Sequence, residues 1–243
     1  MEEHVFQAIK QKKISSQIVD QVKILITNGQ LKPGDSLPPE RELMKVFNVS
    51  RPTLREALNM LSTMGFVQMS QRQRTKVKSL MPSNITEPLR RLLKEDIKTS
   101  LELVEARAII ETANARMAAE RATEKDIARL EKCIEVMKKN IANGSSLNDE
   151  DADFHLAVAE ATQNKIQTHF MFSIYDLLKD KVDLCYHGGV NDILEQHSKI
   201  VEAIIKRDGA MARQRMEEHL AYVELQINQL NESEMQEKRE GII

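Results

Sequence analysis

Four residues in the second half of the chain have the types and spacing of a metal site. Asp151 and His155 are four residues apart, so on a helix both side chains project from one face. His197 and His219 follow on two later segments, each among apolar residues at helical spacing. Three imidazoles and a carboxylate that converge inside a bundle would hold a divalent transition metal. A histidine on an apolar face is more often a core residue, and Asp153 could replace Asp151, so spacing alone leaves both interpretations open.

Arg107 is the second residue that could do chemistry. It lies on an apolar stripe, four residues after Leu103 and three before Ile110. A buried guanidinium needs an anion, and its planar fork binds a carboxylate through two hydrogen bonds. That anion belongs either to a ligand or to Glu111, which is four residues further on and would form an internal ion pair. Asn114 lies on the same stripe and is a further candidate for ligand contact.

Near the N-terminus, residues 37–43 and 49–58 predict two short helices joined by a tight turn. Ser50 is a suitable N-cap for the second helix, and Pro52 falls in its first turn, where a missing N–H costs nothing. The apolar residues expected to face inward are Leu43, Val46, Leu54, Leu58 and Leu61.

The polar residues of these two helices have the chemistry of a DNA-reading element. Arg51 and Arg55 are four apart and share one helical face, and Arg41 can point outward from the first helix. Arginine side chains reach guanine edges or phosphates, and hydroxyl groups such as those of Ser50 and Thr53 bind phosphate oxygens. The alternative is that the arginines only solvate the helix surface.

Residues 65–78 are expected to form a β-hairpin after the second helix. Its first strand lies at 65–69, its returning strand at 75–78, and its tip at 70–74. Three cations of this hairpin, Arg72, Arg74 and Lys76, are placed to contact the DNA backbone or the minor groove. A solvated basic loop is the alternative.

The elements that position these residues follow from helical periodicity. Residues 81–84, Met-Pro-Ser-Asn, interrupt that pattern, so we expect a DNA-binding domain at 1–80 and a linker with a connecting helix at 81–94. An all-helical domain would then span 95–232, with a C-terminal tail at 233–243. Helices are predicted at 87–93, 97–121, 124–142, 148–162, 166–186, 193–206 and 210–230. The fold class is therefore mostly α: a small unit of α-helices with a short β-hairpin, followed by an all-α antiparallel helical bundle.

Charge divides the chain in the same way. Residues 1–79 carry 13 Lys and Arg against 7 Asp and Glu, whereas the remaining residues carry 22 against 30. A basic N-terminal part on an acidic remainder suits a protein that binds nucleic acid with one end. Two cysteines cannot build a disulfide framework, and neither a membrane-spanning run nor a signal-peptide pattern is seen, so we expect a cytoplasmic protein.

Residues 14–77 resemble the winged helix-turn-helix of the GntR family of bacterial transcription regulators. The resemblance includes the lead-in at 31–38, Leu-Lys-Pro-Gly-Asp-Ser-Leu-Pro, and both short helices. It implies DNA contact for Arg41, Arg51 and Arg55, with the hydroxyls of Ser50 and Thr53 beside them. Family members usually carry glycine where this chain has Arg72 and Arg74, so the wing departs from the pattern.

Residues 95–230 resemble the FCD effector domain of the FadR subgroup of that family. Its metal-binding members carry Asp-x-x-x-His followed by one His on each of two later helices. Here the pattern falls on Asp151, His155, His197 and His219. The resemblance also implies that Arg107 faces a ligand cavity, with Asn164 near it, although a helix cap would explain Asn164 equally well.

Together these features predict a regulator that binds a palindromic DNA operator as a homodimer. A small organic acid, bound through a divalent metal and Arg107, would control operator affinity, with no membrane involved. Zinc is the first expectation for the metal, and nickel or manganese are alternatives. Two other interpretations remain: a regulator with a purely structural metal, and a metal-dependent hydrolytic enzyme in which the same site activates water.

Overall fold

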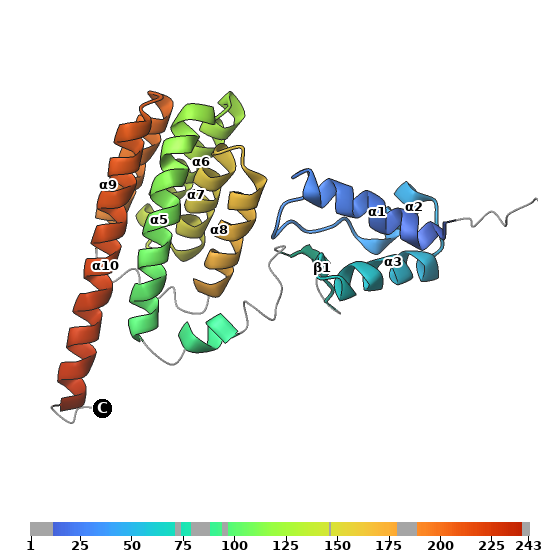
Figure 1. Cartoon of the computed structure of the whole chain (residues 1–243), viewed down its shortest axis with the longest axis horizontal. Coiled ribbons are helices and arrows are strands. Elements are labelled where there is room, and N and C mark those ends of the chain that lie inside the picture. The colour runs from blue at the N-terminus through green and yellow to red at the C-terminus, as the bar shows by residue number, and fades with distance from the viewer. Residues whose placement is uncertain are drawn as a thin grey trace, which may run out of the picture. The chain divides into compact units, whose positions relative to one another are not determined.

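The computed structural model describes residues 12–70, 74–78, 88–93, 97–145, 147–178 and 189–239. The chain divides into two compact units, Met1–Leu80 and Met81–Ile243, coloured blue to teal and green to red in Figure 1. Each unit contains its own cluster of buried apolar side chains. Helices dominate both units, and the mostly α fold class is confirmed. Among the residues described, no helix is long and apolar enough to cross a membrane.

The N-terminal unit packs its helices on a small β-hairpin. Its helices are α1 (Ile14–Thr27), α2 (Glu40–Phe47) and α3 (Arg51–Thr63). Strand β1 (Val67–Gln68) pairs antiparallel with β2 (Lys76–Val77), with Val67 opposite Val77. The predicted pair of helices and the predicted hairpin are both present, and this arrangement is a winged helix-turn-helix.

The turn between α2 and α3 is set by local chemistry. Asn48 ends α2 in the left-handed conformation, with φ of 50°, which asparagine tolerates better than most residues. Ser50 occupies the N-cap position of α3 as predicted, but its hydroxyl lies 2.9 Å from Thr53 Oγ1 and makes no capping hydrogen bond in the described structure. Pro52 lies in the first turn of α3, where it displaces no helical N–H.

Four of the five predicted core residues of this region are buried: Leu43, Leu54, Leu58 and Leu61. The fifth prediction was wrong, because Val46 is 70% exposed. The side of α2 that faces the core runs through Leu43, Met44 and Phe47 instead. Because α2 has only eight residues, the side that it buries is narrow, and Val46 lies outside that side, in solvent.

The C-terminal unit is a helical bundle. After a short helical segment at 88–93, it contains α5 (Ile97–Arg121), α6 (Glu124–Ala142), α7 (Asn148–Ala161), α8 (Lys165–Leu178), α9 (Val190–Ile205) and α10 (Gly209–Arg239). The predicted bounds of α5 and α6 are confirmed. Helix α10 continues to residue 239, where the prediction ended at 230 and gave a tail, because its last turns are polar but rich in helix formers. The predicted end of α8 at 186 lies outside the described residues.

Two glycines of the bundle, Gly144 and Gly209, lie at opposite kinds of helix end. Gly144 follows α6 with φ of 68°, as expected of a glycine that ends a helix. Gly209 does not end a helix in this way: Arg207 takes the left-handed conformation after α9, and Gly209 begins α10. Arg207 is held there by its guanidinium, which donates to the carbonyl of Ala122 at 2.6 Å.

Helices α5, α6, α7, α9 and α10 enclose the main apolar core of the bundle. Figure 1 shows them side by side, with α8 beside α7. Alanines such as Ala115, Ala118 and Ala119 on α5 are fully buried, so neighbouring helices approach this helix closely. Polar side chains that project from α5, α7, α9 and α10 therefore meet inside the bundle.

Candidate metal and DNA-binding sites

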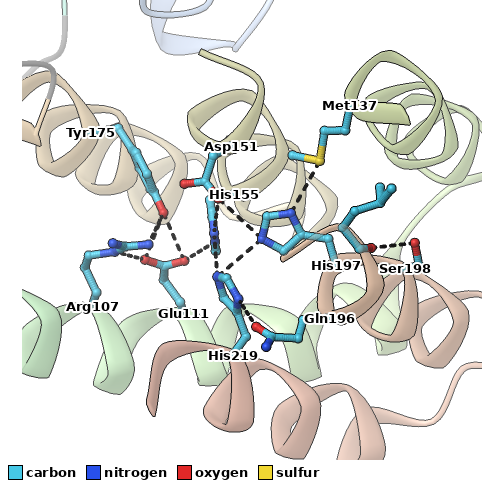
Figure 2. A network of polar contacts seen from close by, with 11 residues as sticks. Arg107, Glu111, Met137, Asp151, His155, Tyr175, Gln196, His197, Ser198 and His219 are labelled. Atoms are coloured by element: carbon cyan, nitrogen blue, oxygen red, sulfur yellow. Dashed lines mark hydrogen bonds and ion pairs between the residues drawn. The ribbon is translucent and has the colours of Figure 1, made fainter. Parts of the chain in front are cut away.

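The four predicted metal ligands converge in the middle of the bundle. Helix α7 supplies Asp151 and His155, α9 supplies His197, and α10 supplies His219 (Figure 2). The Nε2 atom of His219 lies 3.2 Å from His155 Nε2 and 3.3 Å from His197 Nε2. Asp151 Oδ1 lies 3.5 Å and 3.4 Å from the same two atoms. Asp151, rather than Asp153, is the carboxylate of this cluster.

These separations fit one metal ion. Nitrogen and oxygen ligands lie about 2.0–2.2 Å from zinc, so neighbouring ligand atoms in a tetrahedral site are roughly 3.3–3.6 Å apart. The four ligand atoms lie within 4.8 Å of one another, and the three histidines are buried. The donor set of three imidazoles and one carboxylate suits a transition metal better than calcium or magnesium.

The other ring nitrogen of each histidine has its own contact. Nδ1 of His155 meets the carboxylate of Glu111, Nδ1 of His219 lies 2.9 Å from Gln196 Oε1, and Nδ1 of His197 lies 3.5 Å from Met137 Sδ. A histidine whose Nδ1–H donates outward presents the Nε2 lone pair inward, which is the tautomer a metal requires. The contacts of His155 and His219 thus orient both rings toward the centre.

The electrostatics of the cluster favour a cation. Burial alone would raise the pKa of Glu111, but Arg107 and His155 outweigh it and lower that pKa to about 2. The pKa of Asp151 is also lowered, because the three histidines outweigh the effect of burial. Burial alone would lower the pKa of His155, but Glu111 and Asp151 raise it to about 9. A proton on His155 therefore offsets the negative charge of Glu111 and Asp151, which a bound metal ion would otherwise balance.

The other two histidines stay neutral. Burial is the main reason that the pKa of His219 falls to about 3, and the charge of His155 adds to it. The pKa of His197 is lowered well below its usual value, again first by burial and then by His219. Neutral imidazoles keep lone pairs for a metal and add no charge of their own.

Arg107 is buried beside this cluster and forms the internal ion pair that the sequence left open. Its Nε donates to Glu111 Oε1 at 2.7 Å, and its Nη2 donates to the hydroxyl of Tyr175 at 2.5 Å. The Tyr175 hydroxyl also lies 3.3 Å from Glu111 Oε1, so one carboxylate joins Arg107, Tyr175 and His155 (Figure 2). Sequence reasoning placed Glu111 near Arg107 but gave no signal for its contact with a histidine on another helix.

The two predicted asparagines differ. Asn114 is 1% exposed, and neither its amide nitrogen nor its amide oxygen has a hydrogen-bond partner among the described residues. Leaving such a group unsatisfied costs about 1–3 kcal/mol, so its amide is suited to a ligand or a water. Asn164 is half-buried, and its Oδ1 accepts from the N–H groups of Ile166 and Gln167 at 3.1 and 3.4 Å. Asn164 therefore caps the start of α8, which is the alternative that the sequence left open for it.

The predicted DNA-contacting residues lie on the N-terminal unit. Among these predicted residues, Thr53 is half-buried and the exposed ones are Arg41, Ser50, Arg51, Arg55, Arg74 and Lys76. Arg72 lies outside the described residues. Sequence reasoning missed Glu40, whose carboxylate contacts Nε of both Arg51 and Arg55, at 3.1 and 3.3 Å. No spacing rule connects an acid on one helix with cations across a turn.

Comparisons with known proteins agree with both units. Residues 14–77 match the bacterial regulatory proteins of the gntR family, and residues 102–222 match the FCD domain. The HTH-type transcriptional regulator LutR of Bacillus subtilis is 36% identical over 82% of this chain and 94% of its own length. A regulatory protein named for the L-lactate dehydrogenase operon of Escherichia coli is 31% identical over 94% and 92%. A solved GntR structure from Streptococcus agalactiae, 24% identical, covers 86% of this chain and 98% of its own, with a TM-score of 0.53.

Proposed function

Because the chain belongs to the GntR family of DNA-binding transcription regulators and carries an FCD effector domain, we propose that a small carboxylate controls its operator affinity. The carboxylate would bind at a metal centre in the C-terminal bundle. The observation that carries this proposal is the buried cluster of Asp151, His155, His197 and His219, joined to Arg107 through Glu111. The relatives are regulators, so the enzyme interpretation is set aside.

The metal would be held by Asp151 Oδ1 and the three Nε2 atoms. Zinc is our first expectation, with nickel or manganese as alternatives, since imidazole and carboxylate ligands suit all three. When bound, it supplies a Lewis acid for the oxygen atoms of an organic acid. Glu111 and Gln196 would keep the rings of His155 and His219 turned toward it.

Charge supports an anionic effector. Arg107 and a divalent ion contribute three positive charges, whereas Glu111 and Asp151 contribute two negative ones, and neutral histidines add none. One positive charge is left uncompensated in a buried site, and a monocarboxylate would neutralise it. The effector would share Arg107 with Glu111 or take the place of that carboxylate, and the amide of Asn114 would supply a further hydrogen bond.

The relative from Escherichia coli named for the L-lactate dehydrogenase operon supports a small hydroxy acid. Such a molecule combines a carboxylate for Arg107 with a hydroxyl that can reach a metal. Asn164 would act indirectly, by fixing the start of α8, the helix that carries Tyr175.

The N-terminal unit would read the operator in the cytoplasm, where the bacterial chromosome lies. Helix α3 would enter the major groove with Arg51 and Arg55, Arg41 and the hydroxyls of Ser50 and Thr53 would bind beside it, and Arg72, Arg74 and Lys76 would follow the backbone or minor groove. A palindromic operator requires two recognition helices about one DNA turn apart, so the active form would be a homodimer. We expect repression that the acid relieves.

The test is a titration of the full chain on a DNA duplex enriched from a random pool. L-Lactate, glycolate, pyruvate, a dicarboxylate and a sugar acid would be added to metal-loaded and chelator-treated protein while DNA release is followed by fluorescence anisotropy. We expect release by one of these acids, and only from metal-loaded protein. If chelation unfolds the bundle and no acid releases DNA, the metal is structural and the proposal fails.

A further inference from the structure

Glu40 is the first residue of α2, and its carboxylate connects α2 to two arginines of α3. Oε2 accepts from Arg51 Nε at 3.1 Å, and Oε1 accepts from Arg55 Nε at 3.3 Å. The side chain of Glu40 is 28% exposed, whereas those of Arg51 and Arg55 are 65% and 56% exposed. One carboxylate therefore holds two solvent-facing guanidinium groups in a fixed relation.

This arrangement is weak as a source of stability, because exposed ion pairs gain little against water and screening. Its geometry is nevertheless informative. Both contacts use Nε, so among the residues that the structure describes the two terminal nitrogens of each guanidinium remain for an outside acceptor, such as the O6 and N7 atoms of guanine. An arginine already held in its binding rotamer loses less side-chain entropy when it meets a base.

We propose that Glu40 is a positioning residue for base recognition, which orients Arg51 and Arg55 together and so raises the preference for operator over other DNA. The inference rests on the proposed contact of these two arginines with DNA. Glu40 itself would touch no base.

The negative charge of Glu40 contributes in a second way. Nonspecific binding comes from neutralised phosphates, and a carboxylate bound to two arginines reduces the positive charge available to them. Sequence-independent affinity is thereby lowered. Geometry and charge must be separated by experiment, because only geometry makes Glu40 a positioning residue.

Glu42 provides the matched control for charge. It is also in the first turn of α2 and is exposed, but within the described part of the chain it forms no ion pair with either arginine. Glu40→Gln and Glu42→Gln remove the same charge from the same turn. Glu40→Asp keeps the charge but is one methylene shorter, so its carboxylate would not reach both Nε atoms.

The experiment measures binding of the full-length parent and these three variants to two duplexes over a range of salt concentrations. One duplex is enriched from a random pool by the parent, and the other is its scrambled sequence. We expect Glu40→Gln and Glu40→Asp to lower the ratio of specific to nonspecific affinity by about tenfold, the effect of losing one well-oriented base contact. Glu42→Gln should raise affinity for both duplexes alike and leave the ratio near that of the parent.

Other outcomes overturn the inference. If Glu40→Asp keeps the parental ratio, or if Glu40→Gln changes it no more than Glu42→Gln does, Glu40 acts through charge alone. A parent that enriches no sequence would instead refute the DNA contact on which the inference rests, so the two failures are distinguishable. Circular dichroism melting curves would check that each variant is folded, which we expect because Glu40 is only half-buried and both of its arginine partners are exposed.

Discussion

Two arginine–glutamate networks, one on each unit, use the same chemistry in opposite surroundings. Arg107 and Glu111 are each 2% exposed at the side chain, whereas Arg51 and Arg55 share Glu40 in contact with solvent. In the buried network every charge must be balanced, since unpaired ions are costly away from water. In the exposed network an outside partner can reach the guanidinium groups, so Arg51 and Arg55 can contact DNA through their terminal nitrogens while Glu40 holds each Nε. Burial thus decides whether such a pair couples residues within the fold or holds side chains for an external partner.

The largest effect is expected when the buried carboxylate of Glu111 is removed. Glu111→Ala leaves the guanidinium of Arg107 buried without its carboxylate and removes the contact of His155 Nδ1. We expect the free energy of unfolding to fall by about 3–5 kcal/mol. Urea denaturation of the metal-free protein measures it. A loss under about 1 kcal/mol would show that the buried ion pair contributes no more to stability than an exposed pair does.

Metal removal should have an effect of similar size. A ligand that binds only the folded state stabilises it by about 4 kcal/mol at a thousand times its dissociation constant. We therefore expect a chelator to lower the melting temperature of the parent, and His197→Ala to bind little metal and respond little to the chelator. Calorimetry with elemental analysis measures both quantities. His169→Ala, which changes a histidine of α8 outside the cluster, is the control and should keep its metal. Protein prepared without chelator and found free of transition metal would contradict the site.

The recognition helix should show smaller effects, and only on DNA binding. Arg51→Ala or Arg55→Ala removes one proposed base contact and should weaken operator binding by about 1–3 kcal/mol without altering stability. Lys76→Ala, proposed to contact phosphate, should weaken operator and random DNA alike and reduce the salt dependence. Anisotropy titrations at several salt concentrations distinguish the two patterns. Normal operator binding by Arg51→Ala would remove α3 from the role of reading helix.

The sequence predicted elements well where the signal is local. The bounds of α5 and α6 follow from helical periodicity, and the turn between them is fixed by Thr123 and Asp126, which form a capping box. Asp151 and His155 share a face by their spacing alone. The meeting of His197 and His219 with them depends on how α9 and α10 pack, so only the family resemblance indicated it beforehand.

The features missed are contacts between helices. Glu111 joins Arg107 to His155 across α5 and α7, and Glu40 joins α2 to α3. Each is a long-range pair that no period of the sequence encodes. The error at Val46 has the same origin, since the side of α2 that is buried depends on what packs against it.

Effector response should separate the two possible roles of Arg107. Arg107→Ala alone would leave Glu111 buried beside an empty space, so a loss of response could reflect local unfolding. The double variant Arg107→Met with Glu111→Gln removes both charges and keeps the volume, and should recover most of the stability lost in either single variant. We expect it to bind DNA normally while its response to the acid is weakened by about 1–3 kcal/mol. Release of DNA at the parental acid concentration would assign Arg107 to structure alone.

The smallest expected effect completes the comparison. Glu40→Ala breaks an ion-pair network as Glu111→Ala does, but water can solvate both arginines that it leaves. We expect the free energy of unfolding to change by less than about 1 kcal/mol, because exposed pairs contribute about that or less. The change should shrink further at high salt, where exposed charges are screened, whereas the loss in Glu111→Ala should persist because buried charges are screened much less. Urea denaturation of both variants at low and high salt tests this directly. Equal losses that respond equally to salt would mean that burial does not distinguish the two networks. It would then be wrong to separate a buried network that couples residues within the fold from an exposed one that holds arginines for DNA.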